Sequence, residues 1–291
     1  MHNQRFFDQT LAMIERGDVR SAIPMLTGKL FNAFADPARW AETRASLHRH
    51  ALHPILMQDP LAAHSARRPR GYQGDAGLID LIYDMEPPAG ISEFSRKFFE
   101  VTVQFQAPEA VRQRRLAAEP LVLQAHRSGD RVLVLACGHF REGDPLIGED
   151  LRRFTLVDQD PVSLNRVRLQ HGDAINLIEA NVFGYLRQAA KQRAGFDLIY
   201  TLGLTDYLDT RAMQLLHRLI KRCLSPGGRF VLANFAPDHL SIGWMDAVMD
   251  WQLIYRDESE LARYAHEIDL TPKTWRDPTD AVVWCEMAAP L

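Results

Sequence analysis

Residues that could do chemistry recur directly after short apolar runs in the second half of this 291-residue chain. Gly138 follows the first run, Asp158 ends the second, and Asn181 follows the third. A glycine lets backbone pass close to a ligand, and a carboxylate at the tip of the second strand is the expected acceptor for ribose hydroxyls. This combination indicates a site for a ligand that contains a ribose.

The loop at Gly138 differs from a dinucleotide-binding loop. Such a loop has the pattern G-x-G-x-x-G and places pyrophosphate at a helix amino terminus. Here only Gly138 is present, and the bulky His139 and Phe140 follow it. The loop therefore argues against NAD or FAD and is compatible with a ligand that carries no phosphate.

Two acids, Asp158 and Asp160, stand at the end of the second apolar run, and they are expected to have different roles. Asp160 precedes Pro161 and is typical of a helix N-cap, which leaves Asp158 for the ribose. The residues predicted to bind the cofactor are Tyr72, Ala136, Gly138, Arg141, Asp158, Gln159, Asn181, Val182, Thr201 and Leu202.

The segment 201–207 follows the fourth apolar run, where the reacting end of a ligand would lie. The predicted catalytic residues are Tyr72, Asp206 and Tyr207, with His139 also considered for the reacting region. Each has a structural alternative: Asp206 is also suited to capping the next helix, and Tyr207 to packing. Asn181 and Val182 are placed where an adenine edge could meet them.

The elements that must position these residues are strands alternating with helices. Apolar runs at 131–136, 154–157, 176–179, 196–200 and 229–233 predict buried parallel strands. Helical patterns lie between them, the clearest at 212–223, which ends at the turn 225–228. Further helices are expected at about 245–252 and 258–266, and a closing strand pair at 271–275 and 281–285. This alternation predicts a doubly wound α/β sheet, whose ligand lies at the carboxyl ends of the strands.

Residues 1 to 125 form a different region, with apolar residues at three- and four-residue spacing that predict helices. Asp36-Pro37 and Asp59-Pro60 mark helix starts. The glycine-rich segment 70–77 predicts a turn instead of a helix interior. The boundary between the two regions is expected at 125/126.

The composition of the chain argues against several classes of function. A net charge of -3 gives no electrostatic footprint for nucleic acid. The short basic clusters at 67–70 and 112–115 are typical of solvated faces, although a minority of such clusters hold an anionic substrate. Three widely spaced cysteines indicate no structural metal site, and no apolar run is long enough for a membrane helix. We expect a cytoplasmic protein without metal or membrane insertion.

These motifs resemble those of class I S-adenosylmethionine (SAM)-dependent methyltransferases. The similarity rests on VLVLACG (132–138), TLVDQD (155–160), the loop before FDLIY (196–200) and LSPGGRFVLANF (224–235). It implies that 126–291 is a SAM-binding Rossmann-like domain. It also implies that the helical region 1–125 serves as a cap or lid.

A finer resemblance is to a bacterial subgroup described as extracellular-factor 3-hydroxypalmitic acid methyl ester biosynthesis proteins. It rests on RGYQGDAGLIDLIY (70–83), ACGHFRE (136–142), GLTDYL (203–208) and GWMDAVMDWQLIYR (243–256). The resemblance implies O-methylation of a 3-hydroxy fatty acyl carboxylate and a lid role for the loop Tyr72–Asp75. A small-molecule substrate is therefore expected.

Two other functions fit the same residues. A methyltransferase-like enzyme could cyclise SAM to azetidine-2-carboxylate and release methylthioadenosine, with tyrosine faces holding the sulfonium. A non-catalytic SAM-binding module is the second alternative. The methyl acceptor and a homodimeric state are left open by the sequence.

Overall fold

The computed structural model describes residues 2–290. The chain divides into two compact units: Met1–Arg112 with Asp238–Leu253, and Gln113–Pro237 with Ile254–Leu291. The division between the units falls inside helix α8 (Gln106–Ser128), and so does the boundary predicted at 125/126. The division of the chain into a cap and a separate ligand-binding domain stays a prediction.

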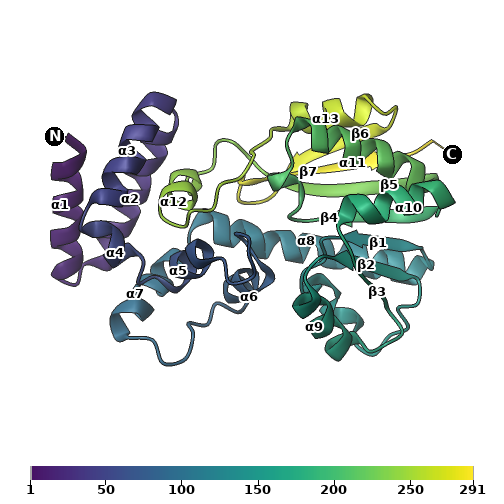
Figure 1. Ribbon diagram of the computed structural model, residues 1–291, viewed down its shortest axis with the longest axis horizontal. Coiled ribbons are helices and arrows are strands. Elements are labelled where there is room, and N and C mark those ends of the chain that lie inside the picture. Colours follow the sequence, from purple (N-terminus) through teal and green to yellow (C-terminus); the bar gives the residue numbers. More distant parts are fainter. Residues whose placement is uncertain (1, 291) are drawn as a thin grey trace. The chain divides into compact units, whose positions relative to one another are not determined.

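The described part of the first unit consists of helices and loops (Figure 1). Its helices besides α8 are α1 (His2–Glu15), α2 (Val19–Phe34), α3 (Pro37–Arg49), α4 (Leu52–Leu56), α5 (Pro60–Arg67), α6 (Ala76–Asp84), α7 (Glu93–Thr102) and α12 (Ile242–Ala247). The carboxylates of Asp36 and Asp59 cap α3 and α5, each with proline in the first turn. The Asp-Pro pairs are therefore confirmed as helix starts.

The glycine-rich loop between α5 and α6 is the turn predicted from the sequence. Gly71 and Gly74 have φ angles of +88° and +64°, a region that favours glycine. Asp75 then caps α6 and accepts a hydrogen bond of 2.8 Å from His64 Nε2. The end of the loop that leads into α6 is thus fixed by contacts of Asp75 within the first unit.

The second unit contains a seven-stranded sheet with the strand order β3-β2-β1-β4-β5-β7-β6 (Figure 1). Its strands are β1 (Val132–Leu135), β2 (Phe154–Asp158), β3 (Asn176–Glu179), β4 (Phe196–Thr201), β5 (Leu224–Phe235), β6 (Thr271–Arg276) and β7 (Val282–Ala288). Strands β1 to β5 pair in parallel, and β7 is antiparallel to β5 and β6. The predicted fold class, a doubly wound, Rossmann-like α/β sheet with an N-terminal helical region, is confirmed.

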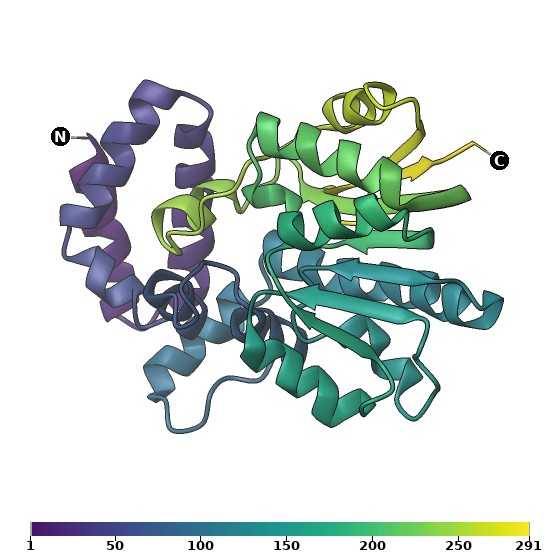
Figure 2. The same cartoon turned by 45° about the vertical axis from the view of Figure 1, so that its right-hand side comes forward.

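One hydrophobic core is shared by the sheet and the helices α10 (Val182–Gln192), α11 (Thr210–Cys223) and α13 (Glu258–His266). Figure 2 shows the ribbons of these helices beside the strands. Leu133 and Leu135 of β1 are fully buried in it together with Leu216 and Ile220 of α11. Side chains two apart on a strand lie on one face, so β1 presents both leucines to this core. The packing fixes where each strand ends.

Strand register then brings the candidate residues to one edge of the sheet. Leu135 lies opposite Val157, and Asp158 lies opposite Glu179. The loop after β1 and the carboxylate that ends β2 are consequently neighbours. This is the edge at which ligands bind in open α/β sheets.

Two element predictions are wrong in detail. The segment Ser225–Gly228, expected as a turn before the fifth strand, belongs to β5, whose pairing with β4 shifts register between Phe196 and Leu198. The helix expected at about 245–252 is α12 at Ile242–Ala247, and it lies in the first unit. None of the helices between residues 2 and 290 is long and apolar enough to cross a membrane.

Candidate active site

The loop after β1 has an unusual backbone. Ala136, Gly138 and Phe140 have φ angles of +53°, +52° and +51°. The left-handed conformation costs roughly 1–2 kcal/mol for a residue with a side chain, and such strain gathers at functional sites. Gly138 thus has a backbone conformation that favours glycine, and Ala136 shares it, whereas the close approach of this loop to a ligand stays a prediction.

Asp158 braces this loop from β2. Its Oδ2 accepts the backbone N–H of Gly138 at 2.8 Å, and its Oδ1 accepts that of Asp160 at 2.9 Å. Burial raises the pKa of this carboxyl, and the backbone N–H groups act in the opposite direction. A carboxylate offers about four acceptor positions, so Asp158 keeps capacity for a hydroxyl group of a ligand.

Asp160 caps the next helix, as expected. Its Oδ1 accepts the backbone N–H of Val162 at 2.9 Å at the start of α9 (Pro161–His171), and its Oδ2 accepts the hydroxyl of Ser163. Gln159, between the two acids, is exposed. Gln159 therefore presents a polar side chain at the tip of β2, and its contact with a cofactor stays a prediction.

The element that follows the β1 loop is the 3-10 helix η1 (Arg141–Leu146), which carries Glu142 and Asp144 in its first turn. Both acids have partners within the protein. Arg141 Nε donates to Asp144 Oδ2 at 3.1 Å, and Glu142 accepts the hydroxyl of Tyr200 at 2.9 Å. Asp144 also forms an ion pair with Arg115 at 3.0 Å, so the charges around η1 are balanced, and the expectation of a ligand without phosphate stays a prediction.

Asn181 and Val182 begin α10. The Asn181 side-chain oxygen accepts the backbone N–H groups of Phe183 and Gly184, at 3.0 and 3.3 Å, and so caps the helix. Its amide nitrogen is the part of this exposed side chain that the cap leaves for a ligand. Thr201, at the end of β4, donates its hydroxyl to the carbonyl of Leu135 at 2.8 Å, and Leu202 is half-buried.

Asp206 lies in the 3-10 helix η2 (Thr205–Tyr207) and is 2% exposed. Its Oδ1 accepts the backbone N–H of Phe235 at 2.7 Å. Burial raises the pKa of this carboxyl to about 6, against the opposing charges of Arg114 and Arg256. The cap of the following helix α11 is Asp209, so the capping alternative for Asp206 is wrong.

Tyr207 and Tyr72 are more exposed to solvent than Asp206. Tyr207 is 38% exposed, which does not fit the alternative that it only packs in the core. Tyr72 is half-buried in the first unit, where the next residue, Gln73, donates its side-chain amide to the carbonyl of Asp250 at 2.8 Å. His139 is buried in the β1 loop. The catalytic roles of these residues stay predictions.

Sequence reasoning missed three buried charged groups in the second unit. Arg256 is 1% exposed and donates to the carbonyls of Thr205 and Leu208, which fixes η2. Glu142 is 6% exposed, and burial raises its pKa. Arg114 of α8, also 6% exposed, contributes to the electrostatics of both Glu142 and Asp206.

A signal for Arg114 was present in the helical spacing. Ala110, Ala118 and Val122 lie four or eight residues away along α8 and are fully buried. An arginine in the middle of an apolar stripe is a buried charge that needs an explanation. Reading the residues 112–115 as one basic cluster concealed it.

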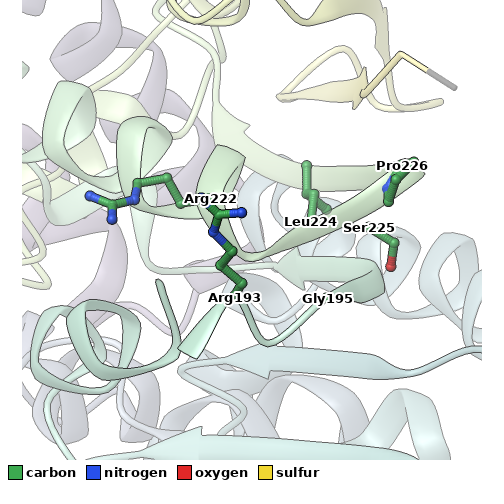
Figure 3. A pocket seen from close by; sticks show the side chains of 6 residues that line it. All are labelled: Arg193, Gly195, Arg222, Leu224, Ser225 and Pro226. Carbon is green, nitrogen blue, oxygen red and sulfur yellow. The ribbon is translucent and has the colours of Figure 1, made fainter. Parts of the chain in front are cut away.

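A surface hollow in the second unit lies elsewhere (Figure 3). It is lined by Arg193, Gly195, Arg222, Leu224, Ser225 and Pro226. These residues stand at the amino ends of β4 and β5, opposite to the edge that holds Asp158 and Asp206. Both arginines are exposed, so the hollow is a shallow surface feature and not the candidate site. Among residues 2–290, no group of three or more His, Cys, Asp and Glu residues is arranged to hold a metal ion.

The fold and this edge define a Rossmann-like domain whose candidate site lies at the carboxyl ends of β1, β2 and β4. The crystal structure of a possible exported protein from Bordetella parapertussis is similar to this chain, with a TM-score of 0.59 and 20% identity over 88% of this chain and 99% of that chain. At this identity the similarity establishes the fold alone.

Two methyltransferases are also found, with lower TM-scores. Magnesium protoporphyrin IX methyltransferase from Synechocystis PCC 6803, with bound S-adenosylhomocysteine (SAH), has a TM-score of 0.49 and 10% identity over 74% of this chain and 95% of its own. 1,6-Didemethyltoxoflavin-N1-methyltransferase from Burkholderia thailandensis has a TM-score of 0.46 and 18% identity over 61% of this chain and 79% of its own. No protein-family model matches the chain, and no curated protein matches it.

Proposed function

We propose that this protein is a SAM-dependent methyltransferase that acts on a small molecule, and that the methyl acceptor is the carboxylate of a 3-hydroxy fatty acid. The observation that carries the proposal is the edge formed by β1, β2 and β4 in this strand order. There a left-handed loop stands next to a carboxylate of the kind that accepts ribose hydroxyls. The acceptor class is inferred from the sequence resemblance of residues 70–83 and 243–256.

The residues present fit SAM by their chemistry. Asp158 keeps acceptor capacity for ribose hydroxyls after bracing Gly138. The loop from Ala136 to Phe140 brings backbone close to the ligand edge.

The chain's own residues would then align and shield the reactants. When bound, SAM supplies an electrophilic methyl group. A carboxylate acceptor is ionised near neutral pH, so the protein needs no general base. Its task is to hold the acceptor in line and exclude water, and Asp206, fixed by the N–H of Phe235, belongs to the rigid wall beside β4.

The test is a product analysis by mass spectrometry of the purified protein with SAM alone and with SAM plus 3-hydroxypalmitate or 3-hydroxydecanoate. We expect SAH and a methyl ester only when the hydroxy fatty acid is present. Methylthioadenosine together with azetidine-2-carboxylate from SAM alone would overturn the transferase in favour of the cyclase. Binding of SAH without turnover of any acceptor tested would favour the non-catalytic module.

A further inference from the structure

Arg114 carries a buried guanidinium to which no residue between 2 and 290 offers a hydrogen-bond acceptor. The residue is 6% exposed, and its Nε is buried without a hydrogen bond. Within residues 2–290 no hydrogen bond or ion pair joins the guanidinium to another side chain or carbonyl. Its neighbours on the same helix instead form ion pairs: Arg112 with Glu109, and Arg115 with Glu119 and Asp144.

The guanidinium faces the turn that follows β4. A Cβ atom added at Gly203 would stand 3.6 Å from Nη1 and 3.8 Å from Nη2 of Arg114. Gly203 comes two residues after the end of β4 and three before Asp206. The two nitrogens therefore lie at the carboxyl end of β4, next to the edge that holds the candidate site.

Burying a charge without a partner costs several kcal/mol, so an arginine in this position needs a compensating group. Asp206 and Glu142 are the nearby buried acids, and neither forms an ion pair with it among the described residues. Asp206 directs its Oδ1 to Phe235 N–H, and Glu142 accepts the hydroxyl of Tyr200. The donors of Arg114 remain available for a group from outside the protein.

We propose that Arg114 binds the carboxylate of the ligand that occupies the carboxyl end of β4, an inference that rests on the proposed function. The planar guanidinium fork matches a carboxylate with two parallel hydrogen bonds. A phosphate dianion would bring a second negative charge beside Asp206 and Glu142, which disfavours it. Two sources carry this chemistry: the methionyl end of SAM and the acid group of the methyl acceptor.

The test is calorimetric titration of wild type, R114Q and the control R127Q, which removes an exposed arginine of the same helix, with two pairs of probes. SAH and methylthioadenosine differ by the amino-acid end, and decanoate and decanol differ by the carboxylate. If the methionyl carboxylate is the partner, R114Q weakens SAH binding by about 10- to 100-fold, the value of charged hydrogen bonds, and leaves methylthioadenosine within about twofold. R127Q should bind all probes like wild type, and R114K should recover part of the SAH affinity.

If the acceptor carboxylate is the partner, R114Q weakens decanoate binding selectively and leaves SAH, methylthioadenosine and decanol unchanged. Equal effects on all four probes would mean that Arg114 is structural and would overturn the inference, as would no effect on either carboxylate. A wild-type protein that binds decanoate but neither SAH nor methylthioadenosine would refute the proposed function, while decanoate would still test Arg114. A wild type that binds neither SAH nor decanoate would overturn both.

Discussion

The titration of Asp206 gives the sharpest prediction about this molecule. Burial raises its pKa from the ordinary value of 3.8 to about 6, so the native state holds the proton more tightly than the unfolded chain does. Unfolding therefore releases a proton between about pH 4 and 6, and the free energy of unfolding falls as pH rises through this window. A pKa shift of about two units corresponds to a contribution of roughly 3 kcal/mol to the free energy of unfolding. This contribution is present at low pH and is lost once the pH exceeds the native pKa.

The variant D206N isolates this effect. Asparagine keeps a side-chain oxygen that can accept the N–H of Phe235, but it does not titrate. Below about pH 4 wild type carries a neutral carboxyl and D206N a neutral amide of the same shape. As pH rises, wild type ionises and D206N does not, so D206N gains stability relative to wild type by about 2 kcal/mol between roughly pH 4.5 and 7.5.

Urea denaturation followed by tryptophan fluorescence at several pH values across this window measures both proteins. The matched control is D173N, which replaces a carboxylate whose side chain is 91% exposed. D173N shows how much of any difference comes from the loss of one surface carboxylate. Parallel stability curves for D206N and wild type would refute the reasoning, because the buried carboxyl would then titrate alike in the native and unfolded states.

Two further predictions concern the β1 loop. D158N should weaken SAH binding by about 10- to 100-fold in calorimetry, because the amide replaces an acceptor oxygen that serves Gly138 or the ribose; unchanged affinity would remove Asp158 from the site. G143A should lower the free energy of unfolding by about 1–3 kcal/mol in urea, since its Cβ would stand 2.1 Å from the Phe140 ring. In the double variant G143A/F140L, the smaller leucine should restore part of the free energy of unfolding that G143A loses. Independent effects of the two substitutions would contradict the packing argument.

Most of the sheet could be predicted because its signal is local. The runs 131–136 and 176–179 are apolar or bounded by turn residues, and the structure has strands at Val132–Leu135 and Asn176–Glu179. Asp36-Pro37 likewise specifies a helix start through one side chain and one fixed φ angle. Such elements follow from neighbours in sequence and need no knowledge of tertiary contacts.

The misplaced helix and the turn at Ser225–Gly228 depend instead on distant contacts. Helix α12 begins earlier than its pattern indicated, where Gly243 packs so closely on α2 that a Cβ would stand 2.6 Å from the Leu30 carbonyl. In β5, Gly228 similarly approaches the carbonyl of Phe196, and Ser225–Gly228 lies in a register shift between Leu224, opposite Phe196, and Arg229, opposite Leu198. Neither approach is visible in the local sequence.

The hydrogen bonds at each strand end reduce the number of residues that are available to a ligand. Asn181 and Asp160 use their side-chain oxygens as helix caps, and Thr201 joins β4 to β1, so the fold already employs the chemistry that made these residues candidates. Asp158 braces the loop and keeps acceptor capacity, while Arg114 has donors that no described residue accepts. A ligand with hydroxyls at one end and a carboxylate at the other would use the capacity that remains. The sequence could list the polar residues at this edge, but only their contacts distinguish those that serve the fold from those that are left for a ligand.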